Sequence, residues 1–280
     1  MAKSFLSICA VVKNEALYIE EWLAFHIVQG FTKFFIYDNQ STDDTVERLR
    51  PFIDKGYVIH YDTKENPCQF ICYNHCITHH KIDAEWCAFL DCDEFLHSER
   101  VPYKGGYKSL TFIENFSVNY LLVKPFDALN VNWVLYGSNG HLAYNPQHVI
   151  QRFRTGSDKI NQHTKAITRL ENTIRVGKNP HYMEVKGATI NDRLDTLTDF
   201  YGLTPNRTDS LLLRINHYHT KSKNEYFERK LTKPDPGTGR FHEKERMEEI
   251  FKIHDVNDSV DLSAYIWLSE VEKTLEKIKS

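Results

Sequence analysis

The stretch AEWCAFLDCDEFL, residues 84–96, decides the fold and raises the question of function. Residues 86–90 are almost entirely apolar and have the length of a buried strand, yet Asp91, Asp93 and Glu94 follow at once. Charges beside a core cost free energy unless something compensates them. In an extended chain, residues two apart point to one side about 6–7 Å apart, so Asp91 and Asp93 are expected to face one cleft. This pattern suggests that Mg²⁺ or Mn²⁺, held together with a diphosphate, supplies the compensation.

The hydrophobic pattern before this stretch predicts an α/β fold. Apolar runs of strand length alternate with segments of helical periodicity that carry start and stop signals. The expected strands are residues 5–12, 33–39, 57–61 and 86–91, and the expected helices are residues 16–30, 41–56 and 69–82. Such alternation predicts a parallel sheet covered on both faces, with ligands bound beyond the carboxyl ends of its strands.

The pattern loosens after residue 100. Short β-like runs are expected at residues 120–126, 149–153, 165–170 and 211–219, and helices at residues 223–231, 243–254 and 263–280. The segment TKPDPGTGR, residues 232–240, contains two Pro and two Gly and is predicted to be a mobile loop.

The composition is that of a globular protein, with 280 residues, 41% hydrophobic and 26% charged, and a formal net charge of -3. This charge argues against a nucleic-acid partner. No apolar run approaches the ~20 residues of a membrane span. We therefore expect no transmembrane segment and a cytoplasmic location, with peripheral contact to a membrane left open. Of the six cysteines, Cys68, Cys72 and Cys76 would line one face of a helix; burial in the core is preferred over a zinc site.

Several motifs together resemble a known family. K-N-E at 13–15, D-N-x-S-x-D at 38–43 and D-x-D-E-F at 91–95 look like the nucleotide-sugar half of a GT-A glycosyltransferase of the family 2 type. The later segments are similar to glycosyltransferase family 92; these are WVLYGSNGH (133–141), KAITRL (165–170), NPH (179–181) and NHYHTKSKNEYFERK (216–230). The resemblance implies a GT-A domain over residues 1–232, divided into a nucleotide-sugar half (1–100) and an acceptor half (101–232), followed by a helical extension (233–280).

The resemblance implies an inverting hexosyltransferase that uses a divalent cation and moves a sugar from a UDP-sugar, with UDP-galactose favoured, to a glycan hydroxyl. The residues expected to hold metal are Asp91, Asp93, His217 and His219. Those expected to contact the donor are Asn14, Glu15, Asp38, Asn39, Gln69, Asn74, Asp91, Lys221 and Ser222. The histidines share a face of a predicted strand, whereas Tyr218 points oppositely.

The catalytic base is less well specified, because no clear acidic pair marks the acceptor site. Asp127, Glu184 and His181 are candidates, and Asp127 could instead cap a loop. Trp133 could either form an aromatic shelf beside the acceptor or fill the core. An alternative function is carbohydrate or nucleotide binding without turnover. The oligomeric state, the acceptor and the linkage are left open by the sequence.

Overall fold

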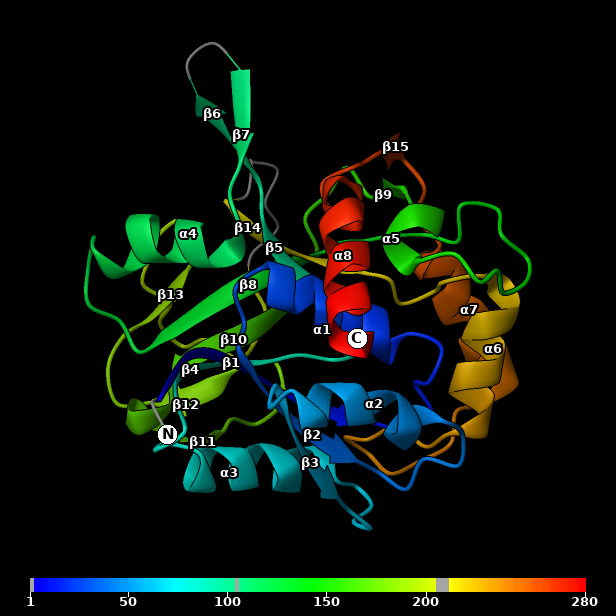
Figure 1. Ribbon diagram of the computed structural model, residues 1–280, viewed down its shortest axis with the longest axis horizontal. Helices are drawn as coiled ribbons and strands as arrows, with labels where there is room; N and C mark the ends of the chain where they lie inside the picture. Colours follow the sequence, from blue (N-terminus) through cyan, green and yellow to red (C-terminus); the bar gives the residue numbers. More distant parts are fainter. Residues whose placement is uncertain (1–2, 104–105, 205–211) are drawn as a thin grey trace.

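The computed structural model describes residues 3–103, 106–204 and 212–280, and Figure 1 shows their arrangement. The strands are β1 (Ser4–Val12), β2 (Lys33–Asp38), β3 (Val58–Asp62), β4 (Ala84–Phe89), β5 (Glu94–Ser98), β6 (Arg100–Tyr103), β7 (Gly106–Ser109), β8 (Ala128–Leu135), β9 (Thr155–Gly156), β10 (Thr164–Arg169), β11 (Thr173–Val176), β12 (Met183–Val185), β13 (Thr189–Asn191), β14 (Leu213–His217) and β15 (Ser259–Val260).

The α-helices are α1 (Ile19–Val28), α2 (Thr45–Asp54), α3 (Gln69–His79), α4 (Phe112–Phe116), α5 (Val149–Arg152), α6 (Lys223–Thr232), α7 (Lys244–His254) and α8 (Leu268–Lys279). Three short turns of other helix types are η1 (Ser117–Leu121), η2 (Leu170–Asn172) and η3 (Tyr265–Trp267).

One large sheet organises the described part of the chain. Its strand order is β3-β2-β1-β4-β10-β8-β14-β5, with β13 added beside β8. β1 to β4 run parallel, β10 is antiparallel to both its neighbours, and β14 is parallel to β8 but antiparallel to β5. The α/β fold class predicted from the sequence is confirmed, with a sheet that is parallel from β3 to β4 and mixed beyond β4.

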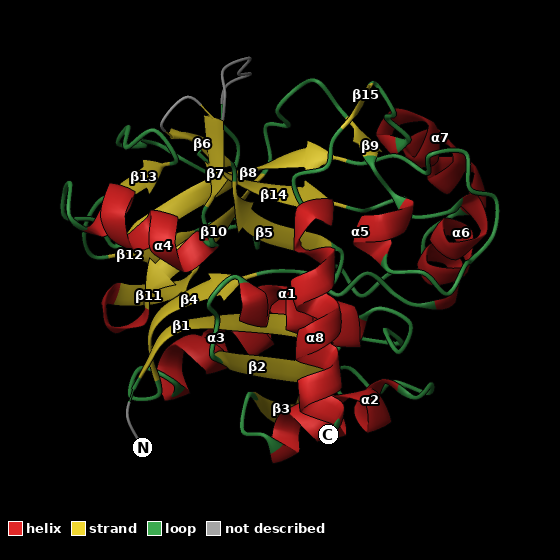
Figure 2. Ribbon diagram, turned by 45° about the horizontal axis from the view of Figure 1, so that its top comes forward, coloured by secondary structure: helices red, strands yellow, loops and turns green. Residues whose placement is uncertain are grey.

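The sheet separates two apolar cores, because alternate side chains of each strand point to opposite faces. On β1, Ile8 and Ala10 pack into the larger core together with α1, α4 and α8, whereas Cys9 packs into the smaller core with α3. Figures 1 and 2 show α8 crossing over α1 on the larger-core side, with α3 on the other side. All six cysteines are buried free thiols, which confirms that Cys72 and Cys76 lie on the core face of α3.

The second half differs from the sequence prediction at two places. Residues 120–126, predicted as a strand, form the end of η1 and a turn, and the strand is β8 instead. Residues 149–153, predicted as β-like, form the short helix α5. In both cases the apolar run is too short for periodicity to separate a strand from a buried helix. The predicted strand at 211–219 is confirmed over Leu213–His217, which form β14; residues 212, 218 and 219 are not in a strand, and residue 211 lies outside the described residues.

A buried ion pair in the second half is tied to the first half by Tyr18. Arg152 of α5 donates to both carboxylate oxygens of Glu225 on α6, at 2.8 and 2.9 Å, and Tyr18 Oη donates to the same carboxylate at 2.8 Å. Glu225 also closes a capping box with Ser222, the residue before α6. Burial alone would raise the pKa of Glu225, but the hydrogen bonds from Arg152 and Ser222 lower it to about 2. This cluster fixes α6 against the sheet end where β1 leads into α1.

Arg152→Met should destabilise the protein by about 3–5 kcal/mol, since it leaves a buried carboxylate without its cation. Urea unfolding at pH 7 measures the loss, and Arg50→Met, which changes an exposed arginine, is the matched control. The depressed folded-state pKa means that the pair stabilises the fold above pH 4.5 and that this contribution fades as pH falls towards 2. The difference between variant and wild type should therefore shrink over that range. A loss under 1 kcal/mol at pH 7 would contradict the assignment.

Candidate active site

The main pocket opens at the carboxyl ends of the parallel strands and has a volume of about 600 Å³. Its wall is formed by the ends of β1 and β2, the start of α3, the turn after β4, strands β8 and β10, the segment before β12, the end of β14, and α6 with the loop that follows. Open α/β sheets bind ligands at this edge. The pocket therefore lies where the sequence predicted ligand binding, beyond the carboxyl ends of the parallel strands.

The two carboxylates of the D-x-D motif lie in the turn between β4 and β5. Asp91 has 37% of its side chain exposed, whereas Asp93 is buried with 8% exposed. The turn is tied by hydrogen bonds from Glu94 N to the Asp91 carbonyl and from Asp91 N to the Glu94 carboxylate, at 3.0 and 2.9 Å. The motif therefore is not extended, but both carboxylates line the pocket.

Asp91 and Glu94 are compensated by Lys165 of β10. Its Nζ lies 2.7 Å from the Asp91 carboxylate and 3.4 Å from that of Glu94. The register pairs Ile167 with Ala88, so the antiparallel strand brings Lys165 level with the end of β4. Burial alone would lower the pKa of Lys165, but the two carboxylates raise it. The predicted source of compensation was a metal ion; at Asp91 the chain supplies a fixed ammonium instead.

Asp93 is compensated by Arg229 of α6 and by His217 of β14. Arg229 Nη2 donates to Asp93 Oδ2 at 3.0 Å, and His217 Nε2 lies 3.5 Å from Oδ1. Burial would raise the pKa of Asp93, but the His217 hydrogen bond and the charges of His217, Arg229 and Lys221 bring it well below its usual range. Asp93 is thus a carboxylate that stays ionised inside the fold.

The two predicted histidines share a face of the chain, as expected from their spacing. His217 and His219 line the pocket with ring centroids 5.3 Å apart, while Tyr218 packs into the core. They differ in their partners. His219 Nδ1 lies 2.9 Å from Nδ1 of His254 on α7, whereas His217 Nδ1 is buried without a hydrogen-bond partner. His217 is accordingly the histidine that faces Asp93.

An aromatic group stands beside His217. Trp133 of β8 lies 4.2 Å from His217 between ring centroids and is stacked with His163 at 5.0 Å. It lines the pocket although only 8% of the residue is exposed, so it takes part in both the core and the pocket wall. His181 also packs edge-on against Trp133, at 5.2 Å.

Eight of the predicted site residues are brought together around the pocket. They are Glu15, Asn39, Gln69, Asp91, Asp93, His181, His217 and His219. Gln69 Nε2 donates to Asp91 Oδ1 at 3.2 Å, which links α3 to the D-x-D turn. Asn39 donates to the carbonyls of Thr63 and Glu65 at 3.3 and 3.1 Å and so holds the loop after β3.

Four predicted donor residues serve the local structure and are absent from the pocket wall. Asn14 accepts from Thr42 N at 2.8 Å, and Asn74 accepts from Val176 N at 3.0 Å. Ser222 caps α6. Lys221 is 1% exposed, has a positive φ of 50°, and its Nζ lies 4.3 Å from the Tyr18 ring centroid. Burial lowers the pKa of Lys221 to about 7. The predicted contact of Lys221 with a phosphate therefore has no support in the geometry.

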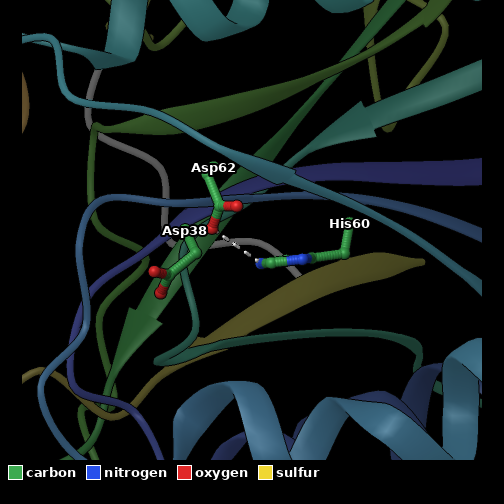
Figure 3. Close-up of side chains that lie close together, drawn as sticks. All are labelled: Asp38, His60 and Asp62. Atoms are coloured by element: carbon green, nitrogen blue, oxygen red, sulfur yellow. Dashed lines mark ion pairs between the residues drawn. The ribbon is translucent and has the colours of Figure 1, made fainter.

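Asp38 belongs to a separate group of side chains. Asp38, His60 and Asp62, on neighbouring strands β2 and β3, each offer a ligand atom within 4.8 Å of the others (Figure 3). Both oxygens of Asp38 already accept from Ser41, one from its backbone N at 2.9 Å and one from its hydroxyl. Asp62 is 81% exposed. The hydrogen bonds from Ser41 therefore satisfy the Asp38 carboxylate. Asp38, His60 and Asp62 all lie outside the wall of the main pocket.

Two of the three candidate bases lie elsewhere. Asp127 accepts from Gly187 N and Asn172 Nδ2, at 2.7 and 2.8 Å, which is the loop-capping role named as its alternative. Glu184 pairs with Arg175 on the exposed β11–β12 hairpin. His181 alone of the three lines the main pocket, because the N-P-H segment turns back over β10.

The sequence interpretation missed most of the basic side chains of the pocket. These are Lys13, Lys165, Lys178, Arg229, Lys230 and Lys233. A lysine at 165 within a buried β-like run was a usable signal, since an unpaired charge there would be costly. Arg229 and Lys230 end the longest quoted motif. Lys233 reaches the carbonyl of Lys13 at 2.7 Å, and the Pro236 carbonyl accepts from Cys68 N and Gln69 N. The segment predicted to be mobile is thus hydrogen-bonded to the pocket wall.

Lys165→Met should destabilise the protein by about 2–4 kcal/mol at pH 7, because it leaves buried Glu94 without its cation. Burial raises the pKa of Glu94, so the variant should regain stability as pH falls and Glu94 takes up a proton. Urea unfolding at pH 7 and pH 5 measures both effects, with exposed Lys252→Met as the control. A loss that is equal at both pH values would show that Lys165 acts through packing and not through charge.

Comparison with known proteins identifies the family. The family model described as "Glycosyltransferase family 92" matches residues 5–248. A family 92 protein of Oryza sativa subsp. japonica is 31% identical over 114 residues, covering 40% of this chain and 19% of its own length. One of Arabidopsis thaliana is 31% identical over 114 residues, with coverages of 39% and 20%. These matches thus span about a fifth of the length of the curated relatives.

Solved structures give more distant matches. Residues 1–349 of S. aureus TarS align with 12% identity and a TM-score of 0.45, covering 96% of this chain and 71% of that one. HddC from Yersinia pseudotuberculosis aligns with 11% identity and a TM-score of 0.36, covering 71% and 88%. No helix in the described part of the chain has both the length and the apolarity that a membrane crossing requires. The family match extends over most of the sequence, and the chain belongs to glycosyltransferase family 92.

Proposed function

We propose that this chain carries the catalytic domain of an inverting, metal-dependent hexosyltransferase that moves a sugar from a UDP-sugar to a glycan hydroxyl. UDP-galactose is the donor that the family resemblance favours. The observation that carries the proposal is the charge pattern of the main pocket. Six lysine and arginine side chains and four carboxylates line one cavity at the carboxyl ends of β1, β2 and β4. The excess of cations suits a ligand with a diphosphate, and the carboxylates suit a divalent ion.

A divalent cation fits the residues Asp93 and His217. Their facing atoms are 3.5 Å apart, one a carboxylate oxygen and one an imidazole nitrogen, and this donor pair suits Mn²⁺ or Mg²⁺ with further oxygen ligands from diphosphate and water. Asp91 is engaged by Lys165 and Gln69, so we assign it to orienting the donor. When bound, the ion would act as a Lewis acid that stabilises the departing nucleoside diphosphate.

The remaining cations of the pocket would neutralise the leaving group from the protein side. Lys230 of α6 lines the pocket beside Arg229, and Lys233 follows one turn later while paired with Glu15. Charges that are fixed before the reaction stabilise a developing diphosphate without reorganisation. Arg229 and Lys230 therefore take the role that the sequence had suggested for Lys221.

His181 is the base that we propose for the acceptor hydroxyl. Its Nδ1 lies 3.1 Å from the Thr164 carbonyl, which can only accept, so Nδ1 carries the proton and Nε2 is free to receive one. Burial and the charge of Lys165 lower the pKa of His181 to about 4, which keeps the ring neutral at pH 7. Trp133, which packs edge-on against His181, lines the same pocket beside it.

Asp93→Asn should remove the Mn²⁺-dependent part of UDP binding, a loss on the order of tenfold in affinity or more. Isothermal titration of UDP with and without Mn²⁺ measures it, and exposed Asp44→Asn is the control. The folded state should persist in the variant, because Arg229 keeps Glu15 at 3.8 Å as a partner. If wild-type protein binds UDP equally well in excess chelator, the metal-dependent part of the proposal is wrong.

His181→Gln should lower turnover by roughly 10²–10⁴-fold while UDP affinity changes little, since a base acts on the acceptor and not on the nucleotide. The readout is UDP released from UDP-galactose in the presence of a mixture of oligosaccharide acceptors. Exposed His79→Gln should behave as wild type. Binding of UDP by wild type without any sugar transfer from a panel of UDP-hexoses would favour the alternative, a binding protein without turnover.

A further inference from the structure

Arg229 holds one carboxylate oxygen of Asp93, next to the oxygen that we assign to the metal ion. The guanidinium contacts Asp93 Oδ2 at 3.0 Å, and both side chains are largely buried, with 11% and 8% exposed. The other oxygen, Oδ1, faces His217. In this arrangement both oxygens of Asp93 have a partner from the chain itself, and a cation that binds Asp93 must compete with the guanidinium.

Arg229 has other possible partners close by, in addition to Asp93. Glu15 Oε1 lies 3.8 Å from its Nη2, and the Tyr18 ring centroid lies 5.7 Å from its Cζ. Two buried polar atoms of this pair have no hydrogen-bond partner: Nε of Arg229 and Oε2 of Glu15. A buried polar group without a partner costs free energy. The guanidinium is therefore incompletely satisfied where it lies, and an anion entering the pocket would offer it a better set of acceptors.

We propose that the Arg229 guanidinium competes with the divalent cation for Asp93. When the diphosphate of the donor enters the pocket, the guanidinium leaves Asp93 and the cation can bind there. This inference rests on the proposed function. A divalent ion and a guanidinium repel each other at short range, so each weakens the binding of the other to the same carboxylate unless a further anion lies between them. The diphosphate is that anion, since Arg229 lines the same pocket.

The consequence is a thermodynamic coupling between metal and nucleotide. Without UDP, the metal has to displace Arg229 and binds weakly; with UDP, the guanidinium has a phosphate to pair with and Asp93 becomes available. Coupling of this kind is reciprocal, so Mn²⁺ must raise UDP affinity by the same factor by which UDP raises Mn²⁺ affinity. Free metal in the absence of donor would leave the site largely in its internally paired state.

Arg229→Gln should raise the affinity for Mn²⁺ in the absence of nucleotide by about tenfold or more, which corresponds to about 1.4 kcal/mol of removed competition. Free Mn²⁺ is measured by electron paramagnetic resonance during titration, a readout that requires no turnover. Arg246→Gln makes the same substitution at an exposed position of α7 and should leave the affinity unchanged. Adding UDP should raise Mn²⁺ affinity much more in wild type than in Arg229→Gln.

The outcomes separate the inference from the proposed function. If Arg229→Gln and wild type bind Mn²⁺ alike without UDP, and UDP strengthens both equally, Arg229 is no competitor although the metal-dependent function stands. If no protein binds Mn²⁺ even with UDP, the metal-dependent function fails and the inference with it. Should Arg229→Gln not fold, Arg229→Lys keeps the charge with a shorter reach and should give an affinity between wild type and the expected gain. An affinity equal to that of wild type would then count against the inference.

Discussion

The site depends on one constraint: carboxylates placed at the end of a buried strand must be compensated inside the protein. Glu94 is completely buried, Asp93 nearly so, and Asp91 adjoins both. Solvent cannot provide the compensation at such burial, and an ion pair repays its desolvation only with close geometry. The chain meets this constraint with Lys165 from one neighbouring strand and Arg229 from a helix more than 130 positions away in sequence. Both cations come from the second half of the fold, which therefore positions the charges that neutralise the end of β4.

Lys165 and Arg229 are positioned beside the carboxylates by different structural features. Lys165 arrives because β10 runs antiparallel to β4, against the direction of the other strands beside it. Arg229 arrives because α6 starts at a capping box whose glutamate is clamped by Arg152 of α5. The capping box and the clamp share one residue, Glu225, so the start of α6 and its position relative to the sheet are set together. An error in that position would move Arg229 relative to Asp93.

The sequence was sufficient for the first half of the fold, and the reasons are local. Runs such as residues 5–12 and 33–39 have strand length and are separated by helices of clear periodicity, so element type and order follow from short-range pattern. Residues 120–126 and 149–153 lack that support. Each is a short apolar run whose structure depends on packing against distant elements, namely the larger core for Phe126 and α6 for Arg152. Short apolar runs of this kind are where tertiary packing overrides local pattern.

The same distinction explains what could be predicted of the site. The grouping of Asp91 with Asp93 and of His217 with His219 depends on spacing within one segment, and all four side chains line the pocket. Lys221 was assigned by its place next to the histidines in sequence, but its left-handed backbone conformation turns the chain and buries the side chain against Tyr18.

Lys165 and Arg229 could not be paired with their carboxylates from the sequence, because strand register and helix placement decide those contacts. A motif therefore identifies which acids gather at a strand end, while only the fold shows which cations already hold them. In this pocket that difference bears directly on the metal site that we propose, since Asp93, the carboxylate assigned to the metal, is also one that the protein neutralises by itself.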